Sequence, residues 1–126
     1  MREVIHTDEA PAAVGAYSQA IGTDEFVFTA GQIALTPEGE LLEDEPIEEQ
    51  TSQALDNITA VLEASGSGLE HVVKVTVFLD DIDDFEAMNA VYGDYFDTEP
   101  PARSALEVGS LPKGASVEIE AVALRP

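Results

Sequence analysis

The stretch His71-Val72-Val73-Lys74-Val75-Thr76-Val77-Phe78-Leu79 is nearly apolar at both alternating sets of positions. Side chains of a strand point alternately to opposite faces of its sheet, so this pattern predicts a strand that is covered on both faces. The rest of the chain, or a partner, must therefore supply a cover for each face.

Two helices are predicted on either side of this strand. From Pro46 onward apolar residues recur at steps of three and four, which predicts an amphipathic helix that ends at Gly66-Ser67-Gly68. A second helix is expected after the acidic run Asp80–Asp84, because short carboxylates can cap free N–H groups. Asn89 falls on the apolar stripe of this second helix, whose other members are Phe85, Met88, Tyr92 and Phe96.

Further strands are expected before and after the helices. Residues Phe26–Leu35 predict either a strand pair or one strand with a bulge at Gly31, and a turn follows at Thr36–Gly39. Pro100-Pro101 forces an extended entry into a strand at Ala102–Val108, and a last strand is expected at Val117–Leu124.

This order of elements predicts an α+β fold in which both helices pack on one face of a mixed sheet. The other face then needs a cover. With only two helices available, the simplest cover is another copy of the chain, which predicts a closed homo-oligomer.

The composition fits one folded domain over residues 1–126, with a mass of 13.4 kDa and 44% apolar residues. The chain has 26 Asp and Glu against 5 Lys and Arg, which gives a formal net charge of -21. Nucleic acid and anionic membranes are unfavourable partners, because the five bases are scattered at Arg2, Lys74, Arg103, Lys113 and Arg125.

The acid excess and the missing cysteines bear on where the protein works. No cysteine is available for a disulfide or a thiolate metal site, and no apolar run is long enough for a membrane span, so we expect a cytoplasmic protein. Self-repulsion of this size is largely screened at high salt, which leads us to hypothesise a high-salt cytoplasm. The alternative is an ordinary acidic protein.

Familiar motifs for cofactors and metals are missing from the sequence. There is no phosphate-binding glycine loop and no nucleophile elbow, and His6 and His71 lack metal-ligand spacing. The acidic run Asp80–Asp84 lacks the pattern of a calcium loop and is better explained as a helix cap. We therefore expect no metal and no cofactor.

Four residues could carry chemistry on the pattern alone. Arg103 follows a rigid Pro-Pro and could hold a planar carboxylate in two parallel hydrogen bonds, or it could form a salt bridge to Glu107 or Glu118. Glu118 and Glu120 share one face of an otherwise apolar strand. If that face is buried, the pKa of at least one of the two carboxyl groups should be raised, which suits proton transfer. If that face is exposed to solvent, both carboxylates are simply solvated. Lys74 could form a Schiff base, or could simply pair with a carboxylate.

Six blocks of sequence, in the same order along almost the whole chain, resemble the RidA/YjgF family. They are Ala10–Ala20, Ala30–Ile33, Val73–Leu79, Met88-Asn89, Pro101–Ser104 and Leu111–Gly114. The resemblance implies a chorismate-mutase-like α+β fold and a homotrimer whose sheets face inward, with three clefts between subunits. It also implies cofactor-free hydrolysis of 2-iminobutanoate and 2-iminopropanoate, which arise from pyridoxal-phosphate-dependent dehydratases, to 2-keto acids and ammonia.

The same resemblance assigns roles to individual residues. Arg103 resembles the family's carboxylate-binding arginine, and Tyr17, Gly31, Asn89 and Glu118 occupy positions that resemble its cleft residues. Ala105 stands where many members carry cysteine, which excludes a thiol mechanism, although its main chain could still hold a water. On this hypothesis Arg103 and Glu118 are catalytic, and Tyr17, Gly31, Asn89, Arg103 and Ala105 bind the substrate.

Other functions remain open at this point. A non-catalytic trimer that binds carboxylate metabolites would use the same Arg103 pocket, and relatives have been described as ribonucleases, translation inhibitors or chaperone-like proteins. The net charge of -21 argues against the RNA-binding alternatives.

Overall fold

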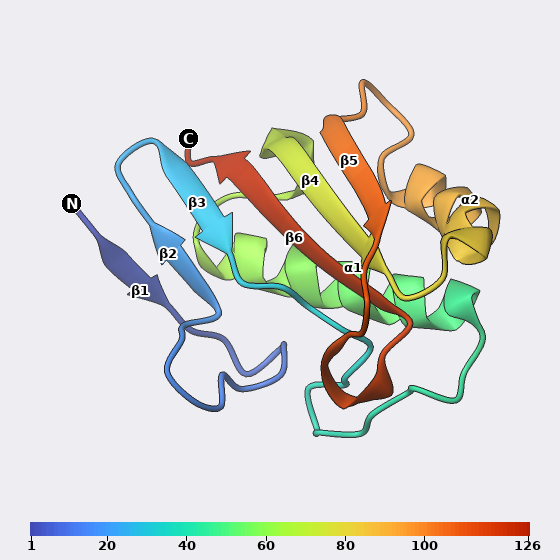
Figure 1. The fold of residues 1–126 in the computed structure, drawn as a ribbon. Coiled ribbons are helices and arrows are strands. Elements are labelled where there is room, and N and C mark those ends of the chain that lie inside the picture. The colour runs from blue at the N-terminus through green and yellow to red at the C-terminus, as the bar shows by residue number, and fades with distance from the viewer.

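The computed structural model describes residues 1–126 and contains one six-stranded sheet in the order β1-β2-β3-β6-β4-β5. Two helices pack behind this sheet (Figure 1). In chain order the elements are β1 Glu3–Ile5, β2 Ala20–Gly22, β3 Phe26–Thr29, α1 Ile47–Ala64, β4 Val72–Leu79, α2 Phe85–Tyr95, β5 Ala102–Glu107 and β6 Val117–Leu124. All neighbouring strands are antiparallel except β4 and β5, which are parallel, so the predicted mixed α+β sheet is confirmed.

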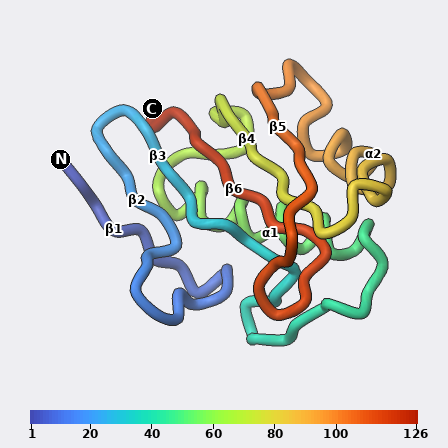
Figure 2. The backbone as a smooth tube through the Cα atoms, in the orientation of Figure 1, coloured from blue at the N-terminus to red at the C-terminus, as the bar shows by residue number.

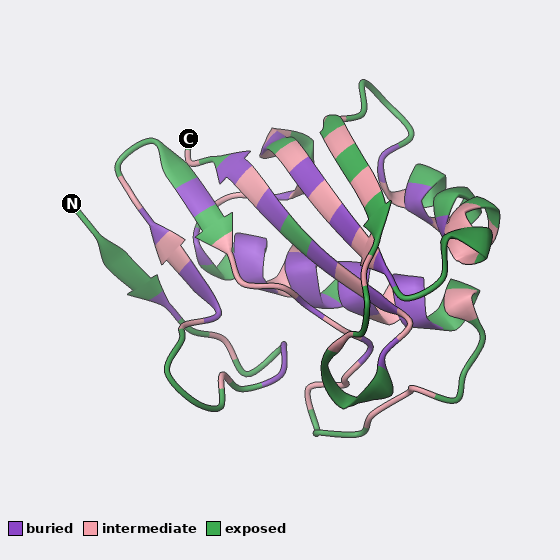
Figure 3. Cartoon of the chain, viewed as in Figure 1, coloured by how far each residue is buried: buried purple, intermediate pink, exposed green.

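The strand that decides the fold is covered on one face only within this chain. Val72, Val75, Val77 and Leu79 of β4 are buried, whereas the residues between them are half-buried or exposed. The same alternation runs along β6, and Figure 3 shows it as bands of colour along both strands. The buried face lies against the helices, and the second face of the sheet is open.

Both predicted helices form close to their expected limits. Helix α1 begins directly after Pro46 and ends two residues before Gly66, whose positive φ of 83° suits the turn that follows. Before α2, the Asp81 carboxylate accepts a hydrogen bond from the main-chain N–H of Asp83 and so caps the 3-10 turn Ile82–Asp84. The acidic run therefore caps this turn and not α2 itself, because Asp84 at the start of α2 makes no side-chain capping bond. Neither helix is long and apolar enough to cross a membrane.

The region predicted as Phe26–Leu35 is a strand with an interruption. Strand β3 ends at Thr29, and Gln32 then pairs with Ile119 of β6 through two main-chain hydrogen bonds of 2.8 and 3.0 Å. The break falls at Ala30-Gly31, which matches the expected irregularity at Gly31. The predicted turn at Thr36–Gly39 also forms, because the N–H of Gly39 donates to the carbonyl of Thr36.

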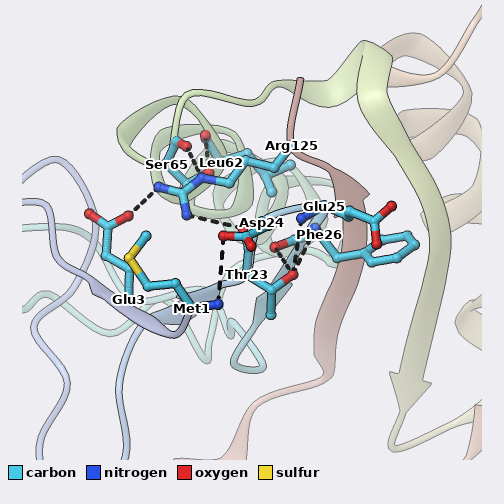
Figure 4. Close-up of polar contacts among 9 residues, drawn as sticks. All are labelled: Met1, Glu3, Thr23, Asp24, Glu25, Phe26, Leu62, Ser65 and Arg125. Carbon is cyan, nitrogen blue, oxygen red and sulfur yellow. Dashed lines mark hydrogen bonds and ion pairs between the residues drawn. The ribbon is translucent and has the colours of Figure 1, made fainter.

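Strands β1 and β2 were not predicted, and they extend the sheet beyond β3. The side chain of Arg125 fastens this edge (Figure 4): Nε donates to the carbonyl of Ser65, Nη1 donates to the carbonyl of Thr23, and Nη2 pairs with the Glu3 carboxylate. One arginine therefore joins the C-terminus to the first strand, the β2–β3 turn and the end of α1.

Candidate active site

A cleft of about 470 Å³ contains three of the residues that the sequence singled out, namely Tyr17, Gly31 and Glu118. The rest of the lining comes from three segments and consists of Pro11, Ala12 and Val14, of Ala30, Gln32, Ile33 and Leu35, and of Pro112 and Lys113. The three wall segments gather at one end of the sheet, as the backbone trace in Figure 2 shows. Most of the lining is apolar, and the charged side chains in it are those of Lys113 and Glu118.

Glu118 lies against the backbone of Gly31 on the open side of the sheet. A Cβ atom at position 31 would lie 2.5 Å from Oε2 of Glu118, so only glycine leaves room for this carboxylate. Burial raises the pKa of Glu118, and the neighbouring charge of Glu120 raises it further. Of the two acids on this face, Glu118 is half-buried and Glu120 is exposed.

Arg103 is held in place without a carboxylate partner. Its Nη1 donates a hydrogen bond of 2.6 Å to Oδ1 of Asn89, and its guanidinium carbon lies 4.6 Å from the centre of the Tyr92 ring. The ring of Phe85 is 5.3 Å away. Neither of the salt bridges considered for Arg103 forms, because Glu107 instead accepts a hydrogen bond from the N–H of Ile82 and Glu118 faces the cleft.

The predicted site is divided between two places in one chain. Arg103 pairs with Val75 in the sheet register and so faces the helices, whereas Glu118 pairs with Phe78 and faces the open side. Strand β5 is also separated from β6 by β4. Arg103, Asn89 and Ala105 thus lie near one edge of the sheet, and Tyr17, Gly31 and Glu118 lie in the cleft.

Two observations refine the predictions for individual residues. Asn89 is exposed at the margin of the α2 stripe rather than buried in it, which leaves its side chain free to meet Arg103. Lys74 donates a hydrogen bond of 2.8 Å to the hydroxyl of Ser104 and has neither a carboxylate partner nor an apolar pocket of its own.

Sequence reasoning gave no role to Lys113, although it lines the cleft. Its backbone is left-handed, with φ of 58°, a conformation that is uncommon for a residue other than glycine. The block Leu111–Gly114 contributed to the family resemblance, and that was the one signal by which Lys113 could have been found.

Comparison with known proteins places this architecture in a family. Residues 7–125 match the family model described as Endoribonuclease L-PSP. The chain belongs to the RidA/YjgF family. It is 51% identical to a RutC family protein of Pyrococcus horikoshii, with 99% of each chain covered. It is 45% identical to a rat protein named 2-iminobutanoate/2-iminopropanoate deaminase, with 99% of this chain and 91% of the rat protein covered.

The likeness to solved RidA/YjgF structures extends over the whole fold. The YjgF gene product of E. coli superimposes with a TM-score of 0.93 at 41% sequence identity, covering 98% of this chain and 99% of the other. This agreement confirms the α+β fold that the resemblance implied.

Proposed function

We propose that this RidA/YjgF protein hydrolyses short-lived 2-imino acids, with 2-iminobutanoate and 2-iminopropanoate as substrates, to 2-keto acids and ammonia. The observation that carries the proposal is the state of Arg103. In a chain with 26 acidic residues, its guanidinium is ordered by Asn89 and two aromatic rings and pairs with none of the acids. Such a guanidinium is available to a carboxylate that comes from outside the chain.

The second part of the proposal is a homotrimer whose sheets face inward and whose clefts lie between subunits. The division of the site supports it, because Arg103 and Glu118 cannot act on one small molecule within a single chain. The open sheet face also carries exposed apolar side chains, among them Phe28, Leu106 and Leu124, at 47%, 41% and 44% exposure. Covering this face with other copies would bring the Arg103 edge of one subunit to the cleft of the next.

In the proposed mechanism Arg103 binds the substrate carboxylate, while Tyr17, Asn89 and the Gly31 backbone shape the pocket. The substrate reacts as the protonated imine. Water, held by Glu118 and the Ala105 main chain, adds through its oxygen to the imine carbon, Glu118 takes one of the water protons, and a neutral carbinolamine forms. Glu118 then protonates the nitrogen of the carbinolamine, the C–N bond breaks, and the departing ammonia removes the hydroxyl proton. The products are the 2-keto acid and ammonium, and no cofactor takes part in these steps.

Generation of the imine in the presence of the protein tests the activity. We expect wild-type protein to accelerate release of 2-keto acid from freshly formed 2-iminobutanoate in molar KCl, and Arg103→Ala to lose most of this acceleration. Sedimentation should give a trimer for both proteins. Turnover that is unchanged in Arg103→Ala, or a wild-type monomer, would contradict the proposal.

The same preparation separates the alternatives. A carboxylate-binding protein without activity would bind 2-ketobutanoate through Arg103 but release no product. RNA binding should be weak at every salt concentration, because the five Lys and Arg form no basic patch along the sequence. If Arg103→Ala retained anti-aggregation activity, a chaperone-like role would be independent of this site.

We further infer that the protein works in the cytoplasm, where the dehydratases that form such imines act.

A further inference from the structure

A buried carboxamide lies directly behind the cleft. The side chain of Gln19 is 2% exposed, and its polar atoms are fully occupied by main-chain partners. Its Oε1 accepts a hydrogen bond of 2.7 Å from the N–H of Thr7, and its Nε2 donates to the carbonyls of Thr7 and Pro11 at 3.0 and 2.7 Å. A longer contact of 3.4 Å reaches the carbonyl of Ala10.

These bonds hold a segment that has no regular structure of its own. Residues 7–18 contain neither helix nor strand, and Pro11, Ala12, Val14 and Tyr17 of this segment line the cleft. Apart from an exposed contact between His6 and Asp8, every hydrogen bond that joins the segment to the rest of the chain ends on Gln19.

The main chain of Gln19 reaches the opposite wall. Its carbonyl accepts a hydrogen bond of 2.9 Å from the N–H of Ala30, which is the residue before Gly31. Ala30 and Gly31 both line the cleft, and Gly31 contacts the Glu118 carboxylate. One residue is thus bonded to the Tyr17 wall through its side chain and to the Gly31 wall through its backbone.

We propose that Gln19 is a positioning residue, which sets the distance between the Tyr17 wall and the Gly31 wall and so keeps the cleft ready for substrate. The inference rests on the proposed function only for its kinetic test. Without the carboxamide, the segment 7–18 populates other conformations. The apparent affinity for ligand then falls in proportion to the fraction of molecules whose cleft keeps the binding-competent shape.

The test compares two substitutions with similar losses of main-chain hydrogen bonds. Gln19→Glu keeps an acceptor for Thr7 but replaces the donating nitrogen with an oxygen that faces the carbonyls of Thr7 and Pro11. Arg125→Met is the control, because it removes the main-chain bonds to Ser65 and Thr23, together with the ion pair to Glu3, at the other end of the sheet, away from the cleft. If Gln19→Glu does not fold, Gln19→Met has similar length without a charge and takes its place.

Kinetics give the first measurement. If about a tenth of the molecules keep the competent cleft, KM for 2-iminobutanoate should rise about tenfold in Gln19→Glu while kcat stays within about threefold of wild type. Arg125→Met should lower the melting temperature and leave both constants within about twofold. A purely structural role for Gln19 predicts instead that the two variants behave alike.

Fluorine NMR gives a second measurement that does not depend on activity. The chain has three tyrosines, so labelling with 3-fluorotyrosine yields three signals, and Tyr17→Phe assigns one of them. In Gln19→Glu the Tyr17 signal should shift or broaden, while those of Tyr92 and Tyr95 stay in place; Arg125→Met should change none.

The outcomes separate the two proposals. A folded Gln19 variant with an unchanged Tyr17 signal overturns the positioning role, and so does an Arg125→Met protein with the same rise in KM. If wild-type protein hydrolyses no imine, the proposed function fails while the fluorine signals still decide the role of Gln19.

Discussion

Gly31 packs directly against the carboxylate of Glu118, and a Cβ at position 31 would lie 2.5 Å from Oε2 and 2.8 Å from Cδ of that side chain. The pair joins the irregular segment after β3 to strand β6, and beside it Gln32 of this segment is hydrogen-bonded to Ile119 of β6. The position of the acid in the cleft is therefore set by the absence of a side chain opposite it.

Gly31→Ala should displace Glu118 with little loss of stability, because the obstructing atoms are the mobile end of a side chain. We expect turnover to fall at least about tenfold, consistent with the loss of a positioned acid–base group, while the melting temperature changes little. The control is Gly109→Ala, where a Cβ meets nothing within 4 Å. Equal activity of the two variants would show that Glu118 need not occupy its observed place.

Arg103→Ala should remove one charge-assisted contact with the substrate. Such a bond is worth about 1.5–3 kcal/mol, which corresponds to a loss of about tenfold to a hundredfold in kcat/KM. Arg103→Lys should recover little of the loss, because an ammonium cannot reproduce the planar pair of donors. The charge-matched control, Arg2→Ala, should retain full activity; if it does not, net charge rather than the Arg103 contact governs the rate.

Glu118→Gln should stabilise the protein at neutral pH while removing activity. Burial raises the pKa of Glu118, so the ionised carboxylate disfavours the folded state above that pKa, and the cost disappears as the pH falls toward the group's ordinary pKa of 4.5. The melting temperature of Glu118→Gln should therefore exceed that of wild type at neutral pH and coincide with it below pH 4.5. If the difference in melting temperature between Glu118→Gln and wild type grew as the pH falls, the raised pKa of Glu118 would be contradicted.

Tyr92 supports Arg103 through its ring, whereas its hydroxyl is buried with no hydrogen-bond partner in the chain. Tyr92→Phe should keep the activity and increase stability by about 1 kcal/mol, because an unsatisfied buried hydroxyl carries a desolvation cost of about that size. Tyr92→Leu should lower activity, since the stacking surface is lost. If Tyr92→Phe lowers the rate as strongly as Tyr92→Leu, the hydroxyl has a partner outside the chain.

The acid excess predicts that stability increases with salt. Burial and the neighbouring acids, led by Asp81, raise the pKa of Asp84 at the start of α2, and about 1 M KCl shortens the screening length to about 3 Å. We expect the melting temperature to rise through a KCl series, and Asp80→Asn to show a smaller rise. Equal or greater stability at low salt would contradict the high-salt hypothesis.

The long elements were predictable because apolar residues recur at the spacing of a strand or a helix several times along each of them. The last strand was predicted over Val117–Leu124 and has those limits, and α1 starts after Pro46 as its periodicity indicated. Strands β1 and β2 have three residues each, which is too short for an alternation to be visible. They form because β2 pairs with β3 and β1 pairs with β2, and because the Arg125 contacts join residues more than 50 positions apart.

The site was predicted as residue types but not as an arrangement. The resemblance gave Arg103, Asn89 and Glu118 together, and only the sheet register shows that Arg103 and Glu118 face opposite sides. The sequence also could not show that Arg103 forms no salt bridge, because Asp and Glu are so frequent that many of them are possible partners. Gln19 was not predicted as a functional residue, because no sequence pattern marks a buried glutamine. Its proposed role depends on the main-chain carbonyls to which its side chain donates, and these are known only from the structure.

The Arg125 contacts bring the two ends of the chain together, since this penultimate residue reaches Glu3 on the first strand. A short glycine linker could thus close the polypeptide into a circle, and new ends could be cut at the exposed residues 97–99 between α2 and β5. Such a circular permutant would keep the sheet order intact, and it offers a route to joining copies of the chain in tandem on a single gene.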